Sequence, residues 1–118
     1  MFVNLSNHPS RCWDKKQIEA SQEFGELIDM PFPQIAPNAT DEELQKLTYQ
    51  YVHRITTLGS PKVIIVHVMG EMTFTFMVVT KLKELGIKCV ASTTERKATF
   101  RSDGTKLSEF SFVKFREY

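Results

Sequence analysis

The run KVIIVHV at residues 62–68 constrains the possible folds of this chain more than any other feature of its sequence. A strand with one face in water alternates apolar and polar residues, whereas a continuous β-branched run is typical of a central parallel strand covered on both faces. Parallel strands need long crossover connections, usually helices, so strands and helices should alternate along the chain. The run therefore predicts an α/β fold with this segment inside the sheet.

The flanking segments fit this alternation. Gly25 and Gly86 suit the position just after a helix, where a residue without Cβ adopts the left-handed conformation, and Thr40 suits a helix N-cap. The segment TFTFMVVT (73–80) alternates as a strand would, but its continuity with KLKELG favours a helix. The predicted strands are 1–5, 26–32, 62–68 and 87–92, and the predicted helices are 13–24, 41–58 and 72–85.

Residues 98–118 alternate polar and apolar residues around Ser102-Asp103-Gly104, a pattern typical of a β-hairpin. We predict a single domain over 1–118, with a Rossmann-like, mostly parallel sheet of strand order 2-1-3-4 and a hairpin extension over 94–118. Ligands of such sheets bind beyond the carboxyl ends of the strands, here at the switch between strands 1 and 3.

Three polar loops should meet at that switch: SNHPS (6–10), VMGEMT (68–73) and STTER (92–96). His8 is a candidate for proton transfer because imidazole titrates near neutral pH. Arg96 can bind phosphate through paired donors, and Glu71 can act as a general base or accept a ribose hydroxyl. The other candidate ligand-binding residues are Ser6, Asn7, Gly70, Thr73, Thr93, Thr94 and Lys97, with the hydroxyl of Ser92 beside them.

Each group also has a purely structural interpretation. Ser6 or Asn7 can cap the first helix while His8 is solvated, and Glu71 can be a first-turn residue matched to the helix dipole. His67, inside the buried run, is more simply a core histidine with satisfied hydrogen bonds. The aromatic residues at 49, 51, 74, 76, 110, 112 and 115 are most simply core.

Charge and cysteine spacing exclude several classes of function. The net charge of +1 draws the chain neither to nucleic acid nor to a membrane, so we expect no direct DNA binding and no membrane attachment. Cys12 and Cys89 match no metal-binding spacing, and the three histidines add no ligand set. We expect reduced thiols, a cytoplasmic protein, and chemistry that needs no metal and no cofactor.

The motifs in these loops resemble those of small stand-alone CRISPR-associated proteins of type III systems, which have a Rossmann-like fold of the CARF kind. The similar parts are an opening strand followed by SNHP and a helix with Trp and Gln, the VMGEMTF turn, the ASTTER segment, and the closing FVKFREY. The resemblance covers most of the chain in outline.

The resemblance implies that the chain binds cyclic oligoadenylate, most often cyclic tetra-adenylate, as a homodimer. Some of these proteins are ring nucleases, in which a ribose 2′-hydroxyl attacks the adjacent phosphate and leaves a 2′,3′-cyclic phosphate end, switching off type III CRISPR signalling. Others only bind or sequester the ligand. The sequence therefore leaves three hypotheses: a metal-independent ring nuclease, a non-catalytic nucleotide-binding module, and a structural protein whose polar loops are only turns.

Overall fold

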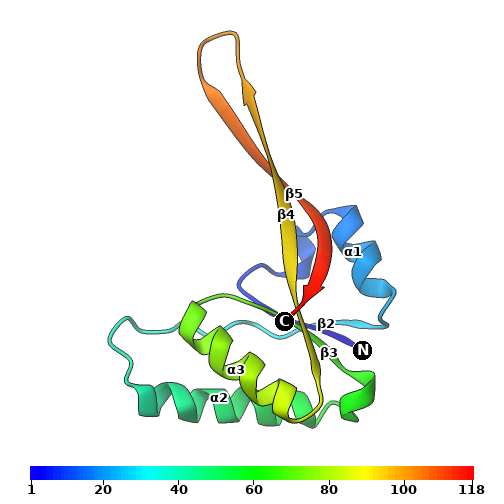
Figure 1. Ribbon diagram of the computed structural model, residues 1–118, viewed down its shortest axis with the longest axis vertical. Coiled ribbons are helices and arrows are strands. Elements are labelled where there is room, and N and C mark those ends of the chain that lie inside the picture. Colours follow the sequence, from blue (N-terminus) through cyan, green and yellow to red (C-terminus); the bar gives the residue numbers. More distant parts are fainter.

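The computed structural model describes all 118 residues and shows a mixed α/β fold with one five-stranded sheet and three α-helices (Figure 1). Two short 3₁₀ helices, Ser10–Cys12 and Pro61–Val63, precede α1 and β3. The principal elements in chain order are β1 (Phe2–Ser6), α1 (Lys15–Gln22), β2 (Leu27–Asp29), α2 (Asp41–Thr56), β3 (Ile65–Met69), α3 (Met72–Glu84), β4 (Lys88–Phe100) and β5 (Lys106–Glu117).

The sheet is mostly parallel, with the strand order β2-β1-β3-β4-β5. The β1–β2, β1–β3 and β3–β4 pairs are parallel, and β4–β5 is antiparallel. This order differs from the predicted 2-1-3-4 with a separate hairpin, because β5 is a fifth strand of the same sheet. The predicted STTER loop is also wrong: β4 runs through it to Phe100, since its threonines favour extended backbone and pair with β5.

Several helix signals in the sequence are confirmed. The Thr40 hydroxyl accepts a hydrogen bond from the Glu43 amide at 3.1 Å and begins α2. The segment 73–80 is helical within α3, and Gly86 follows it with a φ of +79°. The first helix starts later than predicted, because Asp14 is its N-cap. No helix is both long and apolar enough to span a bilayer.

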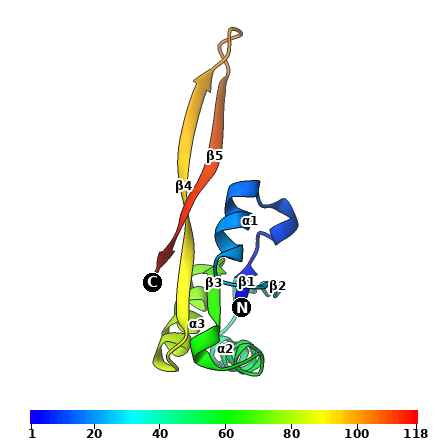
Figure 2. The same ribbon diagram turned by 90° about the vertical axis from the view of Figure 1, so that its right-hand side faces the viewer.

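The central strands β1 and β3 bury both of their faces, each face against different partners. Side chains alternate along β1 and β3, so Val3 and Val66 face the layer of α2 and α3, in a core of 15 buried residues. Phe2 faces the other way and packs with Trp13 and Val90 beneath α1 and β5. Figures 1 and 2 show α1 on the far side of the strands from α2 and α3.

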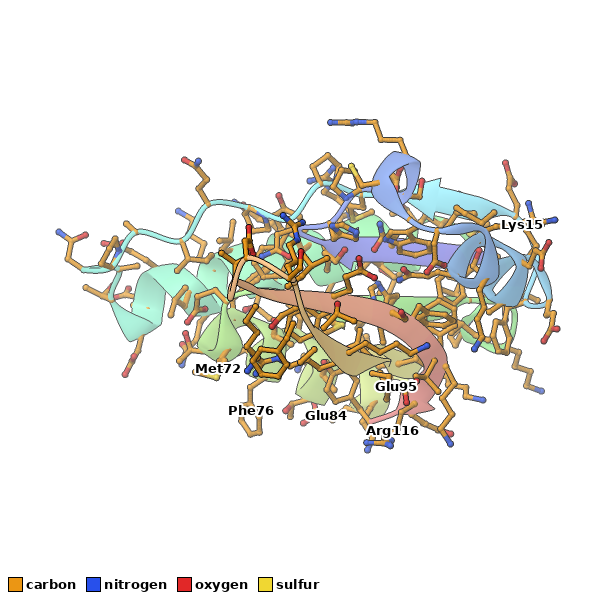
Figure 3. All side chains as sticks on the ribbon, turned by 90° about the horizontal axis from the view of Figure 1, so that it is seen from above. Lys15, Met72, Phe76, Glu84, Glu95 and Arg116 are labelled. Atoms are coloured by element: carbon orange, nitrogen blue, oxygen red, sulfur yellow. The ribbon has the colours of Figure 1, made fainter.

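Three of the aromatic residues predicted as core are exposed instead. Phe76, Tyr49 and Phe110 have exposed fractions of 73%, 71% and 69%, whereas Phe74 and Phe112 are buried. Phe76 lies two residues after Phe74 on α3, which turns it to the opposite side of the helix. Figure 3 shows Met72 and Phe76 pointing outward from α3.

The second half of β4 and the first half of β5 form a two-stranded ribbon that rises well beyond the other elements (Figures 1 and 2). The predicted turn is confirmed at its tip, where Gly104 has a φ of +86°. At the base of the ribbon, the register shifts between Thr93, which pairs with Lys114, and Thr94, which pairs with Phe112. Val113 is the extra residue of this β-bulge.

Candidate functional site

The candidate site lies where β3 and β4 separate. The two strands pair from Ile65 and Lys88 as far as His67 and Val90, and β4 then continues with β5 alone. The space that opens on the α1 side is a cavity of about 470 Å³, here called the β3–β4 cavity. It is lined by Ser6, Asn7, His8, Cys12, Trp13, Asp14, Gln17, His67, Met69, Ser92, Thr94, Phe110 and Phe112.

A chain of hydrogen bonds leads to the wall of this cavity from the edge strand β2. The Asn4 amide nitrogen donates to Asp29 Oδ1 at 2.9 Å. The Asn4 amide oxygen is 2.9 Å from His67 Nδ1, and His67 Nε2 is 2.7 Å from Ser92 Oγ. Gln17 Nε2 on α1 donates to the same Ser92 oxygen at 3.0 Å. Four strands and one helix therefore meet in a single network.

The partners of Asn4 determine which atom is the donor in each hydrogen bond of this network. Its Nδ2 faces two oxygens that can only accept, Asp29 Oδ1 and the carbonyl of His8 at 3.1 Å. Its Oδ1 must then accept from His67 Nδ1, which therefore carries the imidazole proton. His67 Nε2 has a free lone pair and accepts from the Ser92 hydroxyl.

The surroundings of His67 keep this imidazole neutral. Burial, together with a smaller effect of the nearby charge of His8, lowers the pKa of His67 from 6.5 to about 4. The ring is 2% exposed and lies among the rings of Phe2, Trp13 and Phe115, at centroid distances of 6.3, 5.4 and 5.4 Å. Near pH 7 it is thus an uncharged acceptor at Nε2.

Five of the residues singled out in the predicted loops line the cavity: Ser6, Asn7, His8, Ser92 and Thr94. The Ser6 hydroxyl donates to Asn4 Oδ1 at 2.7 Å, so it belongs to the network. Neither Ser6 nor Asn7 caps α1, because Asp14 accepts the amide of Gln17 at 2.8 Å. His8 and Asn7 are exposed, with side chains free to meet a ligand.

The residues predicted from the VMGEMT loop lie away from the β3–β4 cavity and have structural roles. Glu71 caps α3 by accepting the amides of Thr73 at 3.0 Å and Phe74 at 2.7 Å. The Thr73 hydroxyl donates to the same carboxylate, and these hydrogen bonds lower the pKa of Glu71. A side chain at Gly70 would overlap the ring of Phe32, so packing explains this glycine.

The remaining predicted residues lie on β4 above the cavity and do not line it. The Thr93 hydroxyl bonds the backbone of Lys114 across the bulge, at 3.0 and 3.2 Å. Arg96 is exposed and donates to Ser108 Oγ at 3.0 Å on the facing strand. Lys97 is exposed on the ribbon. The sequence predicted a loop at these residues, but β4 is continuous here and places them outside the β3–β4 cavity.

Sequence reasoning missed Asn4, Asp29 and Gln17, and it placed His67 in the core without a role. The sequence did contain a signal for Asn4 and His67. Asn4 and His67 are single polar residues inside apolar strands, and both point to the α1 face by the two-residue alternation. A buried polar side chain needs a partner, and here the two residues are each other's partner.

Asn4→Ala is expected to lower the free energy of unfolding by about 2 kcal/mol, because buried polar atoms on Ser6 and His67 lose their partner. Chemical denaturation monitored by circular dichroism measures the change. Asn7→Ala is the matched control, since Asn7 is exposed and should change stability by less than about 0.5 kcal/mol. Equal effects of the two substitutions would contradict the central place of Asn4 in the network.

Comparison with known proteins gives one match, to the family model described as "Uncharacterized protein MJ1673 family", over residues 1–116. No curated protein and no solved structure matches the chain. No group of three or more His, Cys, Asp or Glu side chains is arranged to hold a metal ion. Both cysteines are free thiols, and burial raises the pKa of Cys89 to about 12.

Proposed function

This chain belongs to the MJ1673 family, and we propose that it binds a cyclic oligoadenylate at the β3–β4 cavity and cleaves it as a metal-independent ring nuclease. The expected ring is cyclic tetra-adenylate, and its cleavage would end a type III CRISPR signal. The observation that carries the proposal is the cavity itself, which gathers hydroxyl, amide and imidazole groups at the carboxyl ends of β1 and β3. The motif resemblance supplies the identity of the ligand and a CARF-like fold.

The lining of the cavity suits one nucleotide unit. The exposed ring of Phe110 offers a flat face for a base, and Asn7, His8 and Thr94 offer donors and acceptors for a sugar and its phosphate. The cavity volume of about 470 Å³ is in the range of small-ligand sites. A ring of four nucleotides is larger than such a site, so most of it must contact protein elsewhere.

A homodimer supplies that additional surface. A ring of four identical units can lie on a two-fold axis, so that two subunits present the same cavity to it. The exposed Arg96 and Lys97 at the base of the ribbon would then be available to the parts of the ring outside the cavity. We propose a cytoplasmic homodimer, in keeping with the two free thiols.

The proposed reaction needs no groups beyond those of the ligand and the chain. The ribose 2′-hydroxyl attacks the adjacent phosphorus, the bond to the 5′-oxygen breaks, and a 2′,3′-cyclic phosphate remains. Holding the hydroxyl in line with the leaving oxygen contributes up to roughly 7–11 kcal/mol in intramolecular reactions. His8, exposed at the cavity rim, is the candidate that protonates the leaving 5′-oxygen.

A second candidate function is binding without cleavage. No Arg or Lys side chain lines the β3–β4 cavity, whereas phosphoryl-transfer sites usually place a cation where negative charge develops. A protein that only sequesters the ring would not need that charge. In this alternative the bound cyclic oligoadenylate stays intact, whereas in the first proposal it is cleaved.

One experiment separates these functions. We expect cyclic tetra-adenylate incubated with the protein in EDTA to give linear products with 2′,3′-cyclic phosphate ends, resolved by chromatography and mass spectrometry. At a ligand concentration 100 times Kd, binding should also stabilise the fold by about 2.7 kcal/mol, seen as a rise in Tm. A rise in Tm with intact ligand would establish sequestration, and neither cleavage nor a rise would refute both functions.

A further inference from the structure

The network behind the cavity ends in a hydroxyl whose hydrogen-bonding capacity is almost fully used. Ser92 Oγ donates its proton to His67 Nε2 at 2.7 Å and accepts from Gln17 Nε2 at 3.0 Å. A serine hydroxyl has one donor and two acceptor positions, so a single lone pair remains. Ser92 is half-buried and lines the cavity, which leaves this lone pair for a ligand.

This arrangement selects the kind of group that can bind there. A phosphate oxygen carries no proton at neutral pH and cannot donate to Ser92, whereas a ribose hydroxyl can. We propose that Ser92 accepts the proton of the attacking 2′-hydroxyl and passes its own proton to His67. This inference rests on the proposed function and names the catalytic base, for which the sequence offered only His8 and Glu71.

Every proton and electron pair in this step is accounted for by the ligand, the protein and water. As the 2′-oxygen bonds to phosphorus, its proton moves to Ser92 Oγ, and the original Ser92 proton moves to His67 Nε2, giving an imidazolium. The 5′-oxygen leaves with the electron pair of its bond to phosphorus and takes a proton from His8 or water. His67 returns its proton to solvent through Ser92 when the product leaves. Ser92 is thus the catalytic residue, and His67 is a positioning residue acting through it.

The rest of the network prepares His67 for this role. Asn4 holds the proton on Nδ1 and so leaves Nε2 unprotonated, and Asp29 holds Asn4 in that orientation. Asp29 is itself held by the Ser10 hydroxyl at 2.7 Å. The other ionisable groups around the cavity are His8, Cys12 and Asp14. Every buried histidine needs hydrogen-bond partners, and here the partners also fix which ring nitrogen is free to accept from Ser92.

The test compares the intact protein with Ser92→Ala, Ser92→Thr and His67→Gln, using cyclic tetra-adenylate and a non-cleavable analogue with 2′-O-methyl groups. We expect Ser92→Ala to lower the cleavage rate at saturating ligand at least 100-fold while binding of the methylated ring changes less than 3-fold. Ser92→Thr keeps a hydroxyl and should restore at least a tenth of the rate. His67→Gln should lower the rate and also remove its decline below about pH 5.

The other possible outcomes contradict either the proton transfer through Ser92 or the proposed function. If the unaltered protein cleaves the ring and Ser92→Ala cleaves it within 3-fold as fast, the Ser92 transfer is overturned and the ring nuclease proposal stands. If the unaltered protein binds the ring but leaves it intact, Ser92 is no catalytic base and sequestration stands. If it neither binds nor cleaves, both this inference and the proposed function are overturned. Thr99→Ala is the control variant, because Thr99 is exposed on the ribbon and its substitution should change neither binding nor the cleavage rate.

Discussion

Phe74→Ala is expected to lower the free energy of unfolding by about 3–5 kcal/mol, the range measured for removing a buried phenylalanine ring. Phe74 is fully buried between α3 and the sheet. Its ring meets Phe32 and Tyr51 edge to face, with centroid distances of 5.3 and 5.6 Å. The substitution removes both aromatic contacts and leaves a cavity that the surrounding strands cannot close. Denaturant unfolding followed by circular dichroism measures the loss.

The matched control for this loss is Phe76→Ala on the same helix. Phe76 is the same residue type two positions later, but 73% of its side chain is exposed. We expect a change of less than about 0.5 kcal/mol, because little apolar surface leaves contact with the core. If Phe76→Ala cost as much as Phe74→Ala, the assignment of the two faces of α3 would be contradicted.

Acid is expected to destabilise the protein through His67, by about 3 kcal/mol between pH 6.5 and pH 4. The pKa of His67 is about 4 in the folded chain, below the ordinary 6.5 of an unfolded histidine. As pH falls through this window, the unfolded chain binds the proton and the folded chain does not, so the free energy of unfolding declines. Well above pH 6.5 the His67 imidazole is neutral in both the folded and the unfolded chain, so its contribution to the free energy of unfolding no longer changes with pH.

Denaturant unfolding at half-unit steps of pH measures the slope, which should reach about 1.2 kcal/mol per unit near pH 5. His67→Gln removes the titrating group and should flatten the profile between pH 6.5 and pH 5, where carboxylates contribute least. His53→Gln is the control, because His53 is exposed on α2. An unchanged slope in His67→Gln would show that another group causes the acid sensitivity.

The parts of the fold that could be predicted from sequence are those set by local chemistry. The apolar run at 62–68 indicated a covered strand, and β3 lies between β1 and β4. Thr40 and Gly86 marked helix ends through their own side-chain and backbone properties. The continuation of β4 past Ser92 could not be predicted this way. Its polar residues suit a loop and an exposed strand equally, and only pairing with β5 decides between them.

The site was less predictable because its residues are distant in sequence. The alternation of β1 and β3 could show that Asn4 and His67 share a face, but not that their side chains are 2.9 Å apart. Loop composition pointed to Ser6, Asn7, His8 and Thr94, which do line the cavity. It also pointed to Glu71 and Gly70, whose polarity and small size serve helix capping and packing. Composition alone does not distinguish such roles.

The β-bulge at Thr93 and Thr94 has a consequence for changes in chain length. Phe112 and Phe115 are three residues apart, yet their rings are 4.8 Å apart, because the extra Val113 returns the strand to the same face. Deleting Val113 would leave Phe112 and Phe115 two residues apart, so both rings would stay on the same face and the strand would pair without a bulge. Removal of this one residue should therefore be tolerated, whereas deletion of a single residue from a regularly paired part of β5 would turn the residues beyond it to the opposite face of the sheet.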